Sequence, residues 1–219
     1  MALEVYWASG SPFAWRVLLT LEAKELPYRS KLLTFSKGEH KSPEYLAMNP
    51  RGKVPTLKDG DFVLYESLAI MAYLDRAYPE RPVFGSGARE TGMIWRLVAE
   101  NISYVCEPIQ KIVAPLFTGG VVGKEAEMRA AAAPVRSELA RLDAIVAKSP
   151  WLAGAAISAA DIVVFPWIPS LLRAAAKEEA KSLDLEFLPL DARYPYLATW
   201  AKRIEAVPGY ERTYPPHWK

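Results

Sequence analysis

Strand-like and helix-like patterns of hydrophobic residues alternate along the first third of the chain. Leu3–Trp7 is a short run rich in apolar and β-favouring residues, which predicts a strand. Ser11 and Pro12 predict the start of a helix, because serine is a favoured N-cap and proline is favoured at the first helical position. This helix should end before Pro27, and Tyr28–Leu33 predicts a second strand. A strand, a helix and a strand at this spacing indicate a βαβ unit with parallel strands and a right-handed crossover.

Two further strands and a helix follow before residue 80. Val54–Leu57 and Phe62–Tyr65 each predict a strand, and the Asp-Gly pair between them is the strongest hairpin signal in the chain. Glu66–Tyr78 has helical spacing and stops before Pro79. The predicted order is therefore βαβ, an irregular segment, ββ and α.

The pattern changes after residue 80. The stretch 79–88 has two prolines and two glycines and predicts a linker, which we place at 81–88. From residue 89 onward strand signals vanish, and Ala, Leu, Arg and Glu dominate. The predicted fold class is therefore an α/β N-terminal domain over 1–80 followed by an all-α C-terminal domain over 89–219.

Two local signals stand out in the helical part. Pro108 should kink a helix over 89–117, because proline removes one backbone hydrogen bond and clashes with the preceding turn. Ser158 and Asp161 have the spacing of a capping box at the start of a later helix. The segment after them, Ile162–Leu172, is apolar but contains two prolines, which predicts a buried helix.

Composition removes several classes of chemistry. The 219 residues carry a formal net charge of +2, which is too small and too scattered to indicate nucleic-acid binding. With 1 Cys and 2 His there is no disulfide within the chain, no Cys-based zinc site and no cluster of histidines. The chemistry should therefore use hydroxyls, carboxylates, lysines, backbone groups or a group supplied by a ligand.

The expected location is the cytoplasm. Met1–Gly10 has no basic stretch and carries Glu4, unlike a signal peptide, and no run of about 18 apolar residues predicts a membrane span. The single cysteine fits a reducing compartment. We expect no membrane partner.

Ser11 allows two interpretations. It can simply cap its helix, or its hydroxyl and the free backbone N–H groups of the helix N-terminus can form an anion site. Ser9 is a nearby alternative donor. No histidine lies near either serine in the sequence, so we expect Ser11 to donate a hydrogen bond to a ligand rather than to act as a nucleophile.

Val54-Pro55 also allows two interpretations. Proline is excluded from central strands unless it starts a strand or follows a cis bond. The pair can therefore be the entry to an edge strand. Alternatively, a cis bond turns the backbone N–H and C=O of Val54 outward, where an extended peptide ligand could pair with them.

Glu66 and Ser67 open a helix directly after a strand. They can complement the helix dipole. Alternatively, Ser67 binds a carboxylate while Glu66 binds an ammonium, which makes a site for an amino-acid head group. Lys41 and Lys53 are the matching cations, although each alone is equally typical of a solvated surface.

Together these features resemble the N-terminal domain of the glutathione transferases. The resemblance rests on three segments, Ser11–Val17, Asn49–Leu57 and Tyr65–Ile70, and the Ser158–Asp161 capping box is similar to one in the helical domain of the family. It covers essentially the whole chain in order and spacing. It implies a thioredoxin-like domain followed by an all-helical domain, usually as a homodimer.

The subfamily is indicated by short motifs. Ser-Pro-Phe at Ser11–Phe13, together with Lys41 and Lys53, is similar to the tau class. Trp15–Val17 is similar to the zeta class, whose Ser-Ser-Cys signature is absent here.

The resemblance implies where glutathione, the expected co-substrate, would bind; it implies no metal. The thiol lies near Ser11 and the cysteinyl backbone meets Val54, with Pro55 cis. The implied contacts of the remaining parts are Glu66 and Ser67 for the γ-glutamyl head, Lys41 and Lys53 for the glycyl carboxylate, and Phe13 as a further contact.

The second substrate should be a small hydrophobic electrophile. Its site should be apolar and formed by the loop before Ser11 and the helical domain. Each aromatic candidate could equally pack in a core. The candidates are Phe13, Phe35, Tyr104, Lys111, Trp167 and Trp218.

The expected function is that of a glutathione transferase in detoxification, in which Ser11 stabilises the glutathione thiolate. A glutathione-dependent isomerase or peroxidase would use the same thiolate, and a non-enzymatic module that binds partners or hydrophobic ligands is the third alternative. Thiol-transferase relatives have cysteine at the Ser11 position, whereas Cys106 is predicted to be buried in the helical part. A glutaredoxin-type mechanism is therefore disfavoured.

Overall fold

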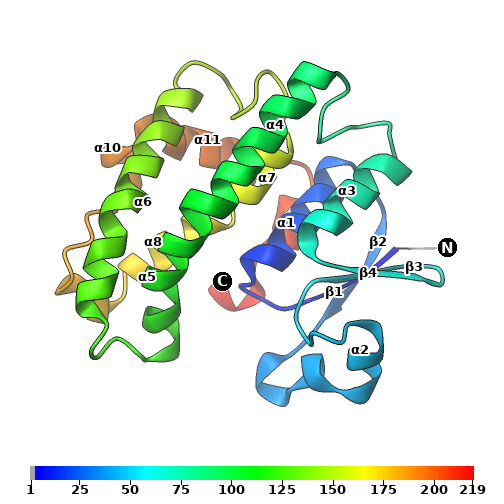
Figure 1. The fold of residues 1–219 in the computed structure, drawn as a ribbon, viewed down its shortest axis with the longest axis horizontal. Coiled ribbons are helices and arrows are strands. Elements are labelled where there is room, and N and C mark those ends of the chain that lie inside the picture. Colours follow the sequence, from blue (N-terminus) through cyan, green and yellow to red (C-terminus); the bar gives the residue numbers. More distant parts are fainter. Residues whose placement is uncertain (1–2) are drawn as a thin grey trace. The chain divides into compact units, whose positions relative to one another are not determined.

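The computed structural model describes residues 3–219, which form two compact units (Figure 1). The first unit consists of residues 3–86 and 206–219, and the second of residues 87–205. The C-terminal segment 206–219 thus packs with the first unit, whereas the sequence analysis assigns it to the helical domain.

The first unit is built on a four-stranded sheet in the order β2-β1-β3-β4. β1 and β2 are parallel and joined through α1, which confirms the βαβ unit, and the other strand pairs are antiparallel. Figure 1 shows α1 and α3 on one side of the sheet and α2 on the other. The elements are β1 (Leu3–Trp7), α1 (Pro12–Ala23), β2 (Tyr28–Leu32), the 3₁₀ turns η1 (Phe35–Lys37) and η2 (Glu39–Lys41), α2 (Pro43–Met48), β3 (Thr56–Asp59), β4 (Phe62–Tyr65) and α3 (Ser67–Ala77).

Local chemistry explains where these elements begin. β3 begins at Thr56 and not at Val54, because Pro55 has no N–H to give to a neighbouring strand. The two 3₁₀ turns and α2 occupy the segment for which the sequence predicted only irregular structure. α2 begins in the same way as α1, with Ser42 as the N-cap and proline as the first helical residue.

The core of the first unit lies between the sheet and the helices α1 and α3. Val5 and Leu57 from the sheet, Leu18 from α1, and Ile70 and Leu74 from α3 are fully buried. Burying side chains of this size stabilises the fold by about 1.5–3 kcal/mol each. The core therefore fixes the N-termini of α1 and α3 relative to the strands from which their chains emerge.

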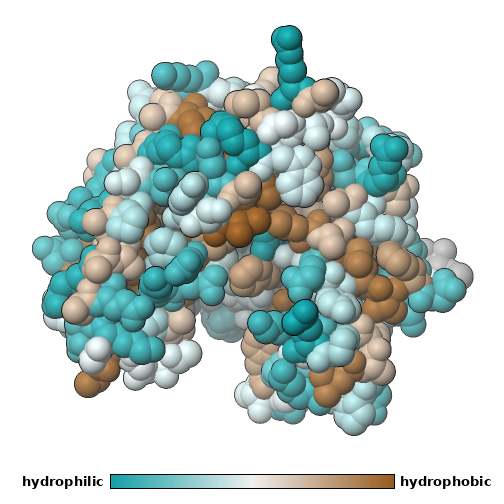
Figure 2. All heavy atoms as spheres, in the orientation of Figure 1, coloured by the Kyte–Doolittle hydropathy of each residue, from teal (hydrophilic) through white to brown (hydrophobic). Residues whose placement is uncertain are grey.

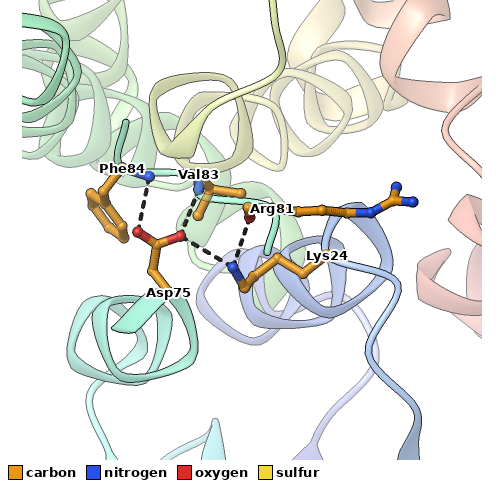
Figure 3. A network of polar contacts seen from close by, with 5 residues as sticks. All are labelled: Lys24, Asp75, Arg81, Val83 and Phe84. Carbon is orange, nitrogen blue, oxygen red and sulfur yellow. Dashed lines mark hydrogen bonds and ion pairs between the residues drawn. The ribbon is translucent and has the colours of Figure 1, made fainter. Parts of the chain in front are cut away.

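A polar network fastens the chain after α3 to the same unit (Figure 3). The ammonium of Lys24 donates to the carbonyl of Arg81 at 2.7 Å and lies 3.3 Å from a carboxylate oxygen of Asp75. Asp75 also accepts from the backbone N–H of Val83 at 2.6 Å and of Phe84 at 3.3 Å. This part of the predicted linker is therefore held by buried charge-assisted hydrogen bonds.

The second unit is helical throughout. Within it α5 packs against α6 and α8, α4 packs against α7, and α11 packs against α6 and α10. Its elements are α4 (Ala88–Glu100), the π-helix η3 (Asn101–Cys106), α5 (Glu107–Thr118), α6 (Glu125–Val146), α7 (Ala159–Val164), α8 (Trp167–Ala175), α9 (Glu178–Lys181), α10 (Leu190–Arg193) and α11 (Pro195–Glu205). α12 (Tyr210–Thr213) and the 3₁₀ turn η4 (Pro216–Trp218) belong to the first unit.

The helix predicted over 89–117 is interrupted in an unpredicted way. The chain passes from α4 through a π-helical turn, Asn101–Cys106, before α5 begins, and Pro108 lies in the first turn of α5. The predicted kink at Pro108 stays a prediction. The structure shows a wider helical turn before this proline, one of the recognised ways to accommodate a break in the hydrogen-bond ladder.

The predicted capping box is confirmed. Asp161 is fully buried and accepts from the backbone N–H of Ser158 at 3.0 Å and from its hydroxyl at 2.9 Å. Its other carboxylate oxygen accepts from the backbone N–H of Leu152 and the indole of Trp200, both at 2.8 Å. Burial raises the pKa of Asp161, and these four hydrogen bonds act in the opposite direction.

The surface is that of an ordinary globular chain. Figure 2 shows a face that is mostly hydrophilic, with scattered hydrophobic patches. Within residues 3–219 no helix is long and apolar enough to cross a bilayer. In the same residues no three His, Cys, Asp or Glu side chains are grouped as metal ligands would be.

Candidate active site

The N-terminus of α1 is the first part of the site. Ser11 is the N-cap, and its hydroxyl oxygen accepts from the backbone N–H of Ala14 at 3.3 Å. The capping interpretation is therefore correct. Since the oxygen serves as an acceptor there, the hydroxyl proton is available to a ligand, at the positive end of the helix dipole. The two interpretations of Ser11 are thus compatible.

The segment before β3 is the second part. The Val54-Pro55 bond is cis, as the second interpretation of this pair requires, and the pairing of a peptide ligand with Val54 stays a prediction. The preceding turn is held from behind by two buried side chains that the sequence analysis did not single out. The hydroxyl of Tyr45 donates to the carbonyl of Lys53 at 2.6 Å, and the amide of Asn49 donates to the same carbonyl at 2.8 Å. Burial raises the pKa of Tyr45, so its phenol stays protonated and able to donate.

The N-terminus of α3 is the third part. Glu66 is its N-cap, with φ of 71°, a left-handed conformation that is uncommon for a residue with a side chain and is typical of functional sites. Ser67 is buried, whereas the carboxylate of Glu66 faces solvent. The guanidinium of Arg51 lies 4.0 Å from that carboxylate. Arg51 is a third residue that the sequence did not single out.

One cavity touches all three parts, with Phe13 from the first turn of α1, although Ser11 itself does not line it. It has a volume of about 250 Å³, and it gathers six of the seven predicted glutathione-binding residues: Phe13, Lys53, Val54, Pro55, Glu66 and Ser67. Asn49 and Arg51 complete its lining. Arg51, Lys53 and Glu66 are exposed, so the cavity opens between two cations and one anion.

Lys41, the seventh predicted residue, does not line this cavity. Its ammonium lies 3.5 Å from the carbonyl of Arg51. A Cβ at Gly52, which has φ of +55°, would lie 2.6 Å from the ammonium of Lys41 and would force that side chain to shift. Lys41 therefore packs on the turn that carries Lys53, and any contact with a ligand stays a prediction.

The predicted electrophile residues divide between the two units. In the first unit, Phe13 and Phe35 are 37% and 47% exposed, and Trp218 packs edge-on against Trp15 with ring centroids 5.4 Å apart. The guanidinium of Arg16 lies 4.8 Å from the centre of the Phe13 ring. Phe13 is therefore both part of the cavity and accessible beside it.

The helical unit holds the other three candidates. Tyr104 is 58% exposed, whereas Trp167 is 3% exposed and packs in the core of this unit. Lys111 pairs with Glu107 one helical turn away at 3.0 Å. A role for these side chains in electrophile binding stays a prediction, as does such a role for Phe35 and Trp218.

A histidine contacts Ser9. His217, from the turn near the C-terminus, places its Nδ1 2.5 Å from the hydroxyl oxygen of Ser9. The statement that no histidine is near in the sequence holds, but it says nothing of this contact, because the two residues are 208 positions apart.

Comparison with known proteins decides the family. The glutathione S-transferase N-terminal domain model matches residues 10–77, and the C-terminal domain model matches residues 125–203. Glutathione S-transferase A of Pleuronectes platessa is 32% identical over 226 residues, which cover 99% of this chain and 92% of the relative. The chain belongs to the glutathione S-transferase family.

Solved structures agree with this membership. A glutathione S-transferase from the Antarctic clam Laternula elliptica has a TM-score of 0.82 and 30% identity, covering 100% of this chain and 94% of that one. Poplar glutathione transferase F1 has a TM-score of 0.80 and 25% identity, covering 97% and 96%. This glutathione S-transferase therefore has the predicted thioredoxin-like fold followed by a helical region.

The subfamily of this glutathione S-transferase stays a prediction. One similar relative, from Euphorbia esula, is named a zeta-class enzyme and is 32% identical over 123 residues, but these cover 56% of the chain. A relative from Zea mays, glutathione S-transferase 4, is 29% identical and covers 95% of the chain. The tau-class similarity rests on the short motifs alone.

Proposed function

We propose that this protein binds glutathione in the cavity beside Val54-Pro55 and activates its thiol through Ser11 for attack on a hydrophobic electrophile. The observation that carries the proposal is the cavity itself, because it unites the first turn of α1, the cis bond and the N-terminus of α3. The family membership and the names of the relatives support the same reaction.

The backbone of Val54 suits an extended peptide. Neither its N–H nor its C=O has a hydrogen-bond partner in the part of the chain that the structure describes. An extended ligand could therefore pair with both groups, as strands do when they add to a sheet edge. The cysteinyl residue of glutathione is the part that we assign to this position.

Charge complementarity orients the rest of the peptide. Glu66 would attract the ammonium of the γ-glutamyl head, and the first N–H groups of α3 with Ser67 would hold its carboxylate. Arg51 and Lys53 at the mouth suit the two carboxylates of an acidic tripeptide. Lys41, behind the turn, adds positive charge to the glycyl end.

The energy needed for activation is modest. A thiol with a pKa of about 8.5 is only about 3% ionised at neutral pH. Lowering that pKa by about two units requires roughly 2.7 kcal/mol. A charge-assisted hydrogen bond from Ser11 supplies about 1.5–3 kcal/mol and the helix dipole about 0.3–1 kcal/mol. In the reaction the thiolate sulfur forms a bond to the electrophilic carbon, and the leaving group departs with its electron pair.

Titration with glutathione tests this proposal directly. The thiolate absorbance of the bound peptide should appear well below the ordinary pKa of a free thiol, and turnover should follow with a panel of aryl halides. Hydroperoxides and isomerisable diketo acids in the same panel test the isomerase and peroxidase alternatives. Failure to bind glutathione at millimolar concentration would contradict the transferase, the isomerase and the peroxidase alike and leave only a non-enzymatic module. Binding without turnover would also favour a non-enzymatic module.

We also propose a cytoplasmic homodimer that acts in detoxification. The exposed apolar side chains Met93 and Trp95 on α4, and Phe62 on β4, are typical of surfaces that a second copy covers. Sedimentation should give twice the mass of one chain. A monomeric mass at micromolar concentration would contradict the dimer and leave the glutathione site unaffected.

Replacing Glu66 with glutamine should weaken glutathione binding about tenfold, the loss of one hydrogen bond to a charged group. Because the carboxylate would meet the amino-acid head, which is remote from the thiol, KM should rise while kcat stays near its original value. Calorimetric titration measures the affinity. Glu80→Gln is the matched control, since Glu80 is equally exposed and lies outside the cavity lining. Equal losses in both variants would show that net charge, and not this contact, matters.

A further inference from the structure

The last residues of the chain are anchored on α1. The indole of Trp15, buried in α1, donates to the hydroxyl of Thr213 at 2.9 Å. Arg212 forms an ion pair with Glu22 of the same helix. The ring of Trp218 stands edge-on to that of Trp15. These contacts hold the turn Pro216–Trp218 beside the loop that leads from β1 into α1.

His217 lies directly against this loop. A Cβ added to Gly10 would lie 2.8 Å from Cε1 of His217, and Gly10 has φ of +82°, so both the space and the backbone favour glycine there. Gly10 is the residue before Ser11. The imidazole therefore sits one residue away from the proposed thiolate donor, while its Nδ1 meets the hydroxyl of Ser9.

The direction of these hydrogen bonds follows from Trp218. Its indole N–H donates to Nε2 of His217 at 2.9 Å. An indole nitrogen can only donate, so Nε2 must be the unprotonated nitrogen and the neutral imidazole carries its proton on Nδ1. That proton is donated to the oxygen of Ser9. The hydrogen bonds of the described residues include no other acceptor for the hydroxyl proton of Ser9. Ser9 is partly exposed, and it lies two residues before Ser11 but does not line the cavity.

We infer that Ser9 is a second hydroxyl donor to the glutathione thiolate, beside Ser11, and that His217 is the positioning residue that orients it. The inference rests on the proposed function. Because His217 holds its proton toward Ser9, the pair donates and does not remove a proton. The thiol proton passes to solvent, and the sulfur gains a hydrogen bond from Ser9 in its place.

The test is the pKa of glutathione bound to the full-length protein, followed by thiolate absorbance. Ser9→Ala should raise that pKa by about one unit, the effect of losing one hydrogen bond to a charged group. His217→Phe keeps a ring but no donor and should raise it by a similar amount. The double variant should add little to either, because both changes remove the same contact. His217→Asn, whose amide N–H lies near the place of Nδ1, should restore most of the shift.

Thr213→Val is the matched control. It removes the hydrogen bond to Trp15 that anchors the segment, but leaves Ser9, His217 and Trp218 unchanged. Its bound thiol should keep the wild-type pKa even if its melting temperature falls. If the role of the C-terminal segment were purely structural, the pKa of the bound thiol would rise in Thr213→Val as it does in His217→Phe.

The outcomes separate this inference from the proposed function. If the wild-type protein does not bind glutathione, both the proposed function and the role of Ser9 are contradicted. If it binds, and the bound thiol has the same pKa in Ser9→Ala as in the wild type, only the role of Ser9 is overturned. If Ser9→Ala shifts the pKa and His217→Phe does not, the positioning role of His217 is overturned.

Discussion

Replacing Ser11 with alanine should lower kcat/KM for conjugation at neutral pH by one to two orders of magnitude. The variant loses the hydrogen bond proposed to stabilise the thiolate, so the pKa of the bound thiol returns toward about 8.5 and the ionised fraction falls to a few per cent. Because the substitution raises the pKa of the bound thiol, its effect depends on pH. The deficit in kcat/KM should be largest below the pKa of the wild-type bound thiol and should shrink as the pH rises toward the pKa of the variant, because the thiol then ionises without help. The measurement is kcat/KM against pH, together with thiolate absorbance.

The control for this variant lies in the same unit. Ser42 caps α2 as Ser11 caps α1, with its oxygen 3.2 Å from the N–H of Tyr45. Ser42→Ala therefore loses an equivalent cap, which costs about 0.5–2 kcal/mol of stability, and should leave the thiol pKa unchanged. Ser11→Thr should retain most activity, since it keeps the hydroxyl. The mechanism is wrong if Ser11→Ala binds glutathione and ionises it as the wild type does.

Replacing Asp161 with alanine should destabilise the helical unit by about 3–5 kcal/mol, the range for breaking a buried polar network. The change leaves the N–H groups of Leu152 and Ser158 and the indole of Trp200 without their buried acceptor. Each unsatisfied group costs about 1–3 kcal/mol. Urea unfolding followed by tryptophan fluorescence measures the loss.

Two milder variants make this prediction specific. Trp200→Phe removes one of the donors and should cost less than Asp161→Ala, although it also changes a buried ring. Asp161→Asn keeps one acceptor oxygen, so its free energy of unfolding should lie between those of the wild type and Asp161→Ala. A loss below about 1 kcal/mol for Asp161→Ala would show that water replaces the carboxylate, contrary to its complete burial.

Local signals were sufficient for most of the sheet-containing unit. Ser11-Pro12 predicted the start of α1, and the Asp-Gly pair after Lys58 predicted the β3–β4 hairpin, because in each case the chemistry that fixes the backbone lies within a few residues. Six of the residues that the family resemblance predicted to bind glutathione line one cavity, and their role stays a prediction.

The features that the sequence did not reveal depend on how segments fold against one another or on the exact form of a backbone turn. Tyr45 and Asn49 meet the carbonyl of Lys53 only because α2 folds behind that turn, and no local pattern marks them. The pairing of Ser9 with His217 joins the two ends of the chain. The π-helical turn before Pro108 could not be predicted either, because proline signals a break without specifying its form.

The discontinuous first unit has a consequence for synthesis on the ribosome. Translation proceeds from the N-terminus, so residues 3–86 emerge well before residues 206–219, which complete the same unit. Until then Trp15 lacks the hydroxyl of Thr213 and the ring of Trp218, and Glu22 lacks Arg212. The helical unit, by contrast, is a single uninterrupted stretch, 87–205. It can fold before residues 206–219 are available to complete the first unit.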